Sequence, residues 1–170
     1  MFETFRTNLP ELEIAFRFLA ACGMGAAIGL DRELKNRAAG LRTHVLTALA
    51  AATFTVLTFE IRHAVVGTDG RVNADPIRII EAVTAGVAFL AGGAIFRGGG
   101  DVHGLTTGAG MWLAGAVGVA CGCGYILLAL IATIMAIAVL DGMKRVQDWL
   151  QIADNGGATK SPAGSKKSKD

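Results

Sequence analysis

Residues 105–140 read LTTGAGMWLAGAVGVACGCGYILLALIATIMAIAVL, a run of 36 positions without one charged side chain. Because the hydrocarbon core of a bilayer is about 30 Å thick, a helix crosses it in about 20 residues, and this run is too long for a single span. Its middle, CGCGY at residues 121–125, carries glycines that suit a tight turn. The run therefore predicts two antiparallel transmembrane helices.

The rest of the chain has the same apolar character. Of its 170 residues, 52% are hydrophobic and 18% are charged, and the mean hydropathy is +0.49, which is more apolar than an ordinary soluble domain. Five apolar runs are long enough for spans, at residues 14–30, 41–61, 77–96, 105–121 and 125–140. We therefore expect an all-α integral membrane protein with five transmembrane helices.

Local signals refine the ends of these spans. Asp75 and Pro76 suit the N-cap and first position of the third helix, and Thr106 or Thr107 suits the cap of the fourth. After the fifth span, residues 141–153 (DGMKRVQDWLQIA) carry the apolar stripe of a short interfacial helix. Residues 154–170 are too polar to bury a core, and we expect them to be disordered.

The distribution of Lys and Arg sets the orientation. Five spans place the termini on opposite sides, and a cytoplasmic C-terminus puts 11 of the 16 basic residues on the cytoplasmic side and 5 outside. Cytoplasmic loops carry the excess of Lys and Arg in membrane proteins. The expected orientation is therefore N-out, C-in.

The segment DRELKNRAAGLRTH, residues 31–44, joins the first two spans and is dense in charge. Its two ends must lie close together, at an interface where a reduced dielectric strengthens ion pairs. The glycine-rich segment 96–108 lacks a phosphate-loop pattern but adds Arg97 on the same side. One interpretation is a functional polar patch; the alternative is a solvated, positive-inside loop. The patch would comprise Asp31, Arg32, Glu33, Arg42, Thr43, His44 and Arg97.

A polar stripe continues from His44 along the second span, where Thr47, Thr55 and Thr58 follow at helical spacing. Polar groups at this depth should face protein or water rather than lipid. One interpretation is that the hydroxyls bond to carbonyls of their own helix. The other is a path for a proton or ion, because histidine titrates near neutral pH.

Charged residues also flank the third span on the opposite side: Asp75, Arg78 and Glu81. Arg78 and Glu81 are three residues apart, which predicts a modest structural ion pair, with cation attraction as the alternative.

Small residues mark the faces where helices are expected to pack. Three G-x-x-x-G spacings occur, and packing within one subunit is their first interpretation, with homodimerisation as the alternative. These pairs are Gly25 and Gly29, Gly104 and Gly108, and Gly118 and Gly122. The three cysteines, Cys22, Cys121 and Cys123, are interpreted as packing residues because they lack zinc-site spacing.

The remaining function classes are narrowed by what the sequence lacks. No nucleophile arrangement, acid–base couple or metal-ligand spacing stands out, so we expect no enzymatic activity and no cofactor. A net charge of +2 argues against nucleic acid as a partner. The expected partners are the lipid bilayer and another membrane protein.

Five blocks, in order, resemble the transmembrane domain of the MgtC/SapB family of bacterial inner-membrane proteins. They are IGLDRE (28–33), AGLRTHVL (39–46), DPIRI (75–79), AFLAGGAIFR (88–97) and GLTTGAGMW (104–112). The chain departs from the family where AFLAGG replaces the usual GFLGAG and where Ala82 replaces a common glutamine. We expect an MgtC/SapB-like transmembrane domain at residues 1–153, without the ACT-like domain of longer members, and a polar tail at 154–170.

The resemblance implies a multi-pass protein of the bacterial inner membrane. It links the chain to growth in low magnesium, acid stress or survival in host cells, and thus to virulence, with regulation of the F-type ATP synthase proposed for some members. We therefore expect a regulator of another membrane complex. The alternative is a transporter or channel for a proton, cation or small solute through the stripe of residues 44–58, although one histidine and a few threonines are poor ligands for octahedral magnesium.

Overall fold

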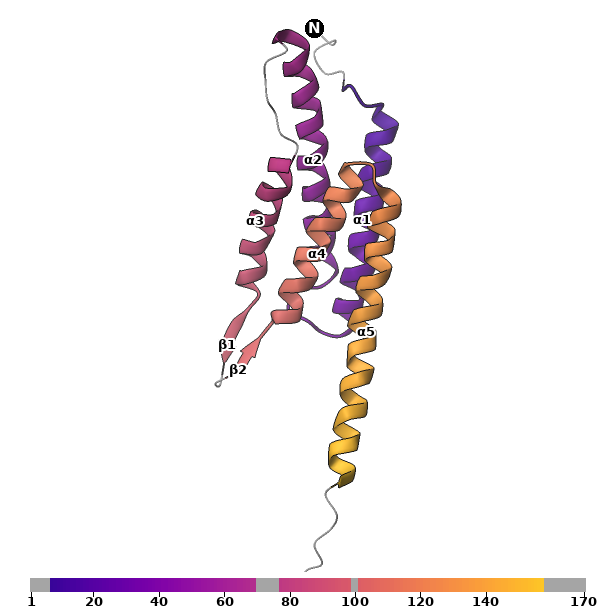
Figure 1. Ribbon diagram of the computed structural model, residues 1–170, viewed down its shortest axis with the longest axis vertical. Helices are drawn as coiled ribbons and strands as arrows, with labels where there is room; N and C mark the ends of the chain where they lie inside the picture. The colour runs from indigo at the N-terminus through magenta and orange to yellow at the C-terminus, as the bar shows by residue number, and fades with distance from the viewer. Residues whose placement is uncertain (1–6, 70–76, 99–100, 158–170) are drawn as a thin grey trace, which may run out of the picture. The chain divides into compact units, whose positions relative to one another are not determined.

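The computed structural model describes residues 7–69, 77–98 and 101–157, and five helices dominate this part of the chain (Figure 1). The expected all-α class is confirmed. The helices are α1 (Glu11–Leu34), α2 (Leu41–Asp69), α3 (Ile77–Gly93), α4 (Leu105–Gly122) and α5 (Ile126–Gly157). Two three-residue strands, β1 (Phe96–Gly98) and β2 (Asp101–His103), lie between α3 and α4.

Three of the helices are long and apolar enough to cross a membrane. They are α1, residues Leu41–Ala64 of α2, and α4, while Ile126–Gly142 of α5 is a shorter apolar segment. Large apolar side chains also point outward, among them Leu19, Phe89 and Leu127, which are 70–83% exposed. Lipid covers such side chains in a bilayer, so the chain is a membrane protein. Five spans and the N-out, C-in orientation stay predictions.

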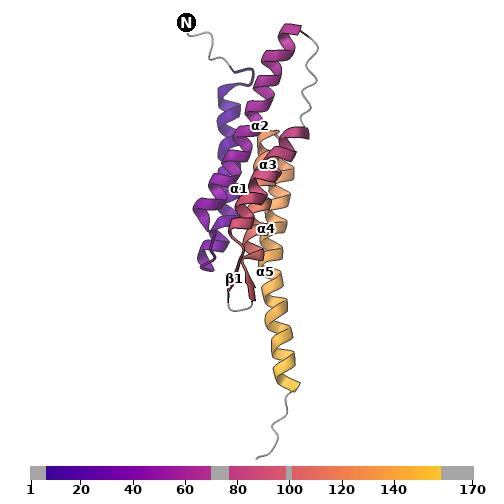
Figure 2. The ribbon, with the colours of Figure 1, turned by 90° about the vertical axis from the view of Figure 1, so that its left-hand side faces the viewer.

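Helix α2 is the centre of the packing in residues 1–137. It packs along both α1 and α4, α1 also contacts α4, and α3 packs mainly on α4. The α1–α2 connection and the β1–β2 hairpin lie at one end of this bundle, and the α4–α5 turn lies toward the other (Figures 1 and 2). The α1–α2 connection and the hairpin, which are predicted to lie on one side of the membrane, therefore share one end of this bundle.

Glycines allow the close approaches within this bundle. A Cβ added at Gly25 would lie 2.8 Å from the His44 carbonyl oxygen, and one at Gly29 would lie 2.8 Å from Leu41 Cα. Each of the six glycines in the G-x-x-x-G pairs meets another segment of the same chain. Gly25, Gly29, Gly118 and Gly122 lie against α2, while Gly104 and Gly108 lie against Ala94 and Ala91. These faces are therefore filled within one chain.

The segment between α3 and α4 differs from the prediction. The third helix was expected to run to residue 96, but α3 ends at Gly93 and Phe96 pairs with His103 in the antiparallel hairpin. Gly104 then serves as the N-cap of α4 with φ 88°, and no side chain caps this helix. The assignment of Thr106 or Thr107 as the cap was wrong, since Gly104 holds that position.

The end of α4 has the turn expected at residues 121–125. Gly124, at φ 85°, donates to the Cys121 carbonyl and Tyr125 donates to the Ala120 carbonyl, both at 2.9 Å. This pair of bonds is the Schellman motif, which closes a helix and turns the chain. The positive φ explains why glycine stands at position 124.

Helix α5 continues past the expected end of the fifth span. It runs without a break to Gly157, so the interfacial helix expected at 141–153 is the C-terminal part of α5, and residues 154–157 are helical as well. The rest of the predicted tail, residues 158–170, lies outside the described residues. Residues 138–170 form a unit of their own, apart from residues 1–137.

Candidate functional site

The connection between α1 and α2 is built by a helix-closing motif at the end of α1. Asn36 adopts a left-handed conformation with φ 50°. Its N–H donates to the Glu33 carbonyl and the N–H of Arg37 donates to the Arg32 carbonyl, each at 3.0 Å. Asparagine is one of the few residues besides glycine that adopts this conformation readily, so the sequence itself ends α1 here.

Glu33 also starts the next helix. Its Oε2 accepts the N–H of Leu41, the first residue of α2, at 2.9 Å. A carboxylate at a helix N-terminus satisfies a free N–H and interacts favourably with the helix dipole. A Cβ at Gly40 would overlap this carboxylate, so the glycine leaves the room that the cap needs.

His44 lies one turn into α2 and is completely buried. Its Nδ1 donates to the Gly40 carbonyl at 2.8 Å, and because a carbonyl only accepts, Nδ1 carries the proton. Its Nε2 is buried without a hydrogen-bond partner in the described part of the chain. A Cβ at Gly110 in α4 would lie 3.2 Å from this atom, so His44 faces a neighbouring helix.

Arg32 is the second buried charged or titratable side chain at this end of the bundle, with 3% of its surface exposed. Its Nη2 donates to Thr107 Oγ1 in α4 at 3.0 Å, whereas its Nε is buried without a partner among the described residues. Asp31 accepts from Lys35 at 2.6 Å through Oδ1, and its Oδ2 is buried and unpartnered there. We call Asp31, Arg32, His44 and Thr107 the polar cluster.

The residues of the predicted polar patch thus fall into a buried group and a more exposed group. Arg32 and His44 are buried, whereas Glu33 and Arg42 are exposed, and Thr43 is half-buried. Arg97 lies in β1, but its side chain lies outside the described residues. Sequence reasoning missed Thr107 because a threonine at a helix start usually caps that helix, and only the fold brings it to Arg32.

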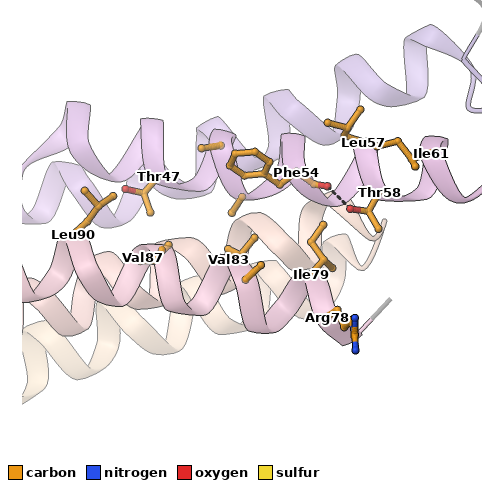
Figure 3. Close-up of a pocket in the computed structure, with 14 residues that line it drawn as sticks. Thr47, Phe54, Leu57, Thr58, Ile61, Arg78, Ile79, Val83, Val87 and Leu90 are labelled. Carbon is orange, nitrogen blue, oxygen red and sulfur yellow. Dashed lines mark hydrogen bonds between the residues drawn. The ribbon is translucent and has the colours of Figure 1, made fainter. Parts of the chain in front are cut away.

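The threonines of the predicted stripe are bonded to their own helix. Thr47, Thr55 and Thr58 donate to the carbonyls of Thr43, Ala51 and Phe54 at 2.7–2.9 Å. Thr47 and Thr58 line a crevice between α2 and α3, with apolar neighbours such as Phe54 and Val83 (Figure 3). Thr55 instead lies against Gly122 of α4. This geometry fits the interpretation of hydroxyls satisfied within α2.

The charged residues predicted on the opposite side are only partly described. Asp75 lies outside the described residues, while Arg78 and Glu81 are exposed on α3. No ion pair joins Arg78 to Glu81, both of which are described. Glu60 makes the contact that the sequence did not predict, because its carboxylate accepts the N–H groups of Asn8 and Leu9 at 2.7 and 3.0 Å.

Side chains of the kinds that bind metal ions or react as thiols are present among the described residues. Within the described residues, no group of three or more His, Cys, Asp or Glu side chains is placed to hold a metal ion. Cys22, Cys121 and Cys123 are free thiols. Burial raises the pKa of Cys123, at the α4–α5 turn, against an opposing effect of Arg17, which keeps the less reactive thiol form.

Comparison with known proteins identifies the relatives of this chain. Protein MgtC of Brucella abortus (strain 2308) is 41% identical over 116 residues, which cover 68% of this chain and 45% of that protein. Protein SrpB of Synechococcus elongatus is 37% identical over 150 residues, with 82% and 81% covered. The "Putative magnesium transporter YhiD" of Escherichia coli is 34% identical over 129 residues, with 76% and 60% covered. No solved structure matches the chain.

The relatives differ in length from this chain, which spans slightly less than half of the Brucella protein. The family model named MgtC matches residues 18–149, and these include the α1–α2 connection, the polar cluster and the β1–β2 hairpin. The resemblance noted in the sequence is thereby confirmed, and the chain belongs to the MgtC family.

Proposed function

We propose that this protein is a non-enzymatic regulator in the bacterial inner membrane that acts by contacting another membrane complex. The contact surface is the end of the bundle that carries the α1–α2 connection. This regulation would serve adaptation to low magnesium, to acid stress or to life in host cells. The F-type ATP synthase is a candidate target.

One observation carries this proposal: the α1–α2 connection has exposed charges, and three sets of hydrogen bonds hold it in place. Arg37 and Arg42 are exposed. The connection that carries them is fixed by the Asn36 turn, by the Glu33–Leu41 bond and by the Arg32–Thr107 bond. A pre-organised charged surface loses little conformational entropy when a partner binds, and charge complementarity selects the partner.

The test is co-purification of partners from native membranes in mild detergent. Arg37→Gln and Arg42→Gln are expected to lose a membrane partner that the unaltered chain retains. The matched control is Arg62→Gln, because Arg62 is also exposed and lies about 30 Å from Arg42 along α2. Retention of every partner by the Arg37 and Arg42 variants would contradict the proposal.

The second candidate function is movement of a proton or cation through the bundle. The name of the Escherichia coli relative, which calls it a putative magnesium transporter, favours this function. So do three buried atoms that have no partner among the described residues: His44 Nε2, Arg32 Nε and Asp31 Oδ2. The internally bonded threonines favour the regulator instead. Measurement of ion flux into vesicles that contain the purified protein distinguishes the two candidate functions. A conductor is expected to lose flux on His44→Ala. It is expected to keep its flux on Thr53→Ala, because Thr53 lies on the exposed side of α2.

A further inference from the structure

The crevice between α2 and α3 has a volume of about 590 Å³ and is built from one face of each helix. Figure 3 shows Arg78 near Thr58 at one end, and Thr47 with Leu90 at the other. Several of its lining side chains, including Phe54 and Leu57, are at least half exposed. The crevice is therefore open to whatever surrounds the helices.

Arg78 is the one charged residue that lines this crevice. It is exposed, and it has neither a hydrogen bond nor an ion pair within the described residues, although Glu81 is only one turn away. The hydroxyls of Thr47 and Thr58 are already used by their own helix. The crevice thus presents a long apolar wall and, at its end, one cation that has no partner among the described residues.

The length of this wall matches one leaflet of a bilayer. Residues 78–90 of α3 extend about 18 Å at 1.5 Å per residue, and half of the hydrocarbon core is about 15 Å. Arg78 is the second residue of α3, which places it at the level where lipid phosphates lie. Guanidinium groups bind phosphates with two parallel hydrogen bonds, and apolar walls are poor hosts for water.

We propose that this crevice is a binding site for one phospholipid, with an acyl chain between α2 and α3 and the phosphate on Arg78. A lipid satisfies both halves of the site at once, because its acyl chain covers the apolar wall and its phosphodiester pairs with the guanidinium of Arg78. This inference stands apart from the proposed regulatory function, which uses the other end of α2.

The test is native mass spectrometry of the purified chain with phosphatidylglycerol, phosphatidylethanolamine or diacylglycerol added. The unaltered chain is expected to retain one of either phospholipid, and to retain diacylglycerol about tenfold less, since a charge-assisted hydrogen bond contributes that much. Arg78→Gln is expected to lower phospholipid binding by a similar factor. Its control is Arg62→Gln, because Arg62 lies at the end of α2 nearest Arg78 but does not line the crevice.

A second variant tests the apolar half of the site. Gly86 lines the crevice, and a Cβ there meets nothing within 4 Å, so Gly86→Leu adds an apolar side chain to the crevice lining at a position with room for its Cβ. It is expected to abolish retention, whereas Gly23→Leu, at an equally open position in α1, is expected to preserve it.

Three results would overturn the proposal. One is equal binding of diacylglycerol and phospholipid, and another is unchanged binding by Gly86→Leu. The third is a dimer that binds no lipid and dissociates on Gly86→Leu, because a second copy would then occupy the crevice.

Discussion

Arg32 is a charged residue that the fold buries almost completely. A guanidinium with 3% exposure has given up most of its hydration, and Thr107 Oγ1 is its one hydrogen-bond acceptor that the described residues supply. A buried charge without partners is costly, so each bond that remains is worth more than a bond at the surface. The hydrogen bond that joins Arg32 of α1 to α4 therefore depends on a single hydroxyl.

Replacing that hydroxyl is the first prediction. Thr107→Val keeps the shape of the side chain but leaves Arg32 Nη2 without its acceptor, which is expected to lower the free energy of unfolding by about 1–3 kcal/mol. Denaturant unfolding in detergent micelles measures it. Thr107→Ser is expected to retain most of the stability. Thr53→Val, whose hydroxyl is exposed, is the control, and an equal loss there would contradict the role of Arg32.

At the same scale, the sequence singled out candidate residues but did not show where their side chains lie. Asp31, Arg32 and His44 stand out as charged or titratable groups beside apolar runs. Whether such a group points outward or inward depends on the rotation of the helix, and a helix that is apolar on all sides gives no amphipathic signal to fix it. The partner Thr107, 75 residues away, can be found only from the fold.

The start of α2 is the first feature at the scale of elements. Glu33→Ala removes the acceptor of the Leu41 N–H and is expected to loosen the first turn of α2, at a cost of about 0.5–2 kcal/mol. Hydrogen exchange measures the change, and amides at residues 41–44 are expected to exchange faster. Gly40→Ala should act in the same direction, since its Cβ displaces the carboxylate. Unchanged exchange in both variants would exclude the cap.

The contact between α2 and α4 gives the next prediction. A Cβ at Gly118 would overlap the Ala48 carbonyl oxygen and lie 2.8 Å from Ala51 Cβ, so Gly118→Ala must push the two helices apart. Overpacking of this kind is expected to cost about 1–3 kcal/mol and to lower the melting temperature in detergent. Gly23→Ala, with open space around it, is expected to leave the melting temperature unchanged or raised. Equal behaviour of the two variants would contradict the close contact.

Element boundaries were predictable where the sequence changes abruptly. The helices α2 and α4 begin at Leu41 and Leu105, the first residues of the second and fourth apolar runs, although the cap of α4 was placed two or three residues too late. The β1–β2 hairpin was not predicted, because strands of three residues are too short for an alternating pattern to be recognised. The length of α5 was underestimated because its amphipathic end continues the helical period of the apolar part.

At the scale of the whole molecule, side-chain size rather than hydropathy separates the interior from the exterior. Ala48, Ala52 and Ala114 are fully buried, whereas Leu19 and Phe89 are exposed. Small residues let helix backbones approach within a membrane, and lipid accepts the large apolar side chains outside. Composition therefore established a membrane protein, but hydropathy alone did not distinguish the core from the lipid-facing surface.

The orientation of this bundle is the last prediction, and it decides which compartment holds the proposed contact surface. Arg42 and Arg62 are exposed and about 30 Å apart along α2, which equals the thickness of the hydrocarbon core. In a chain whose three cysteines are replaced by alanine, Arg62→Cys is expected to react with a membrane-impermeant maleimide in cells whose cytoplasmic membrane is intact. Arg42→Cys is expected to react only after that membrane is opened. The reverse pattern would place the α1–α2 connection outside, where no cytoplasmic partner reaches it, and labelling of both sites in intact cells would show that α2 does not span the bilayer.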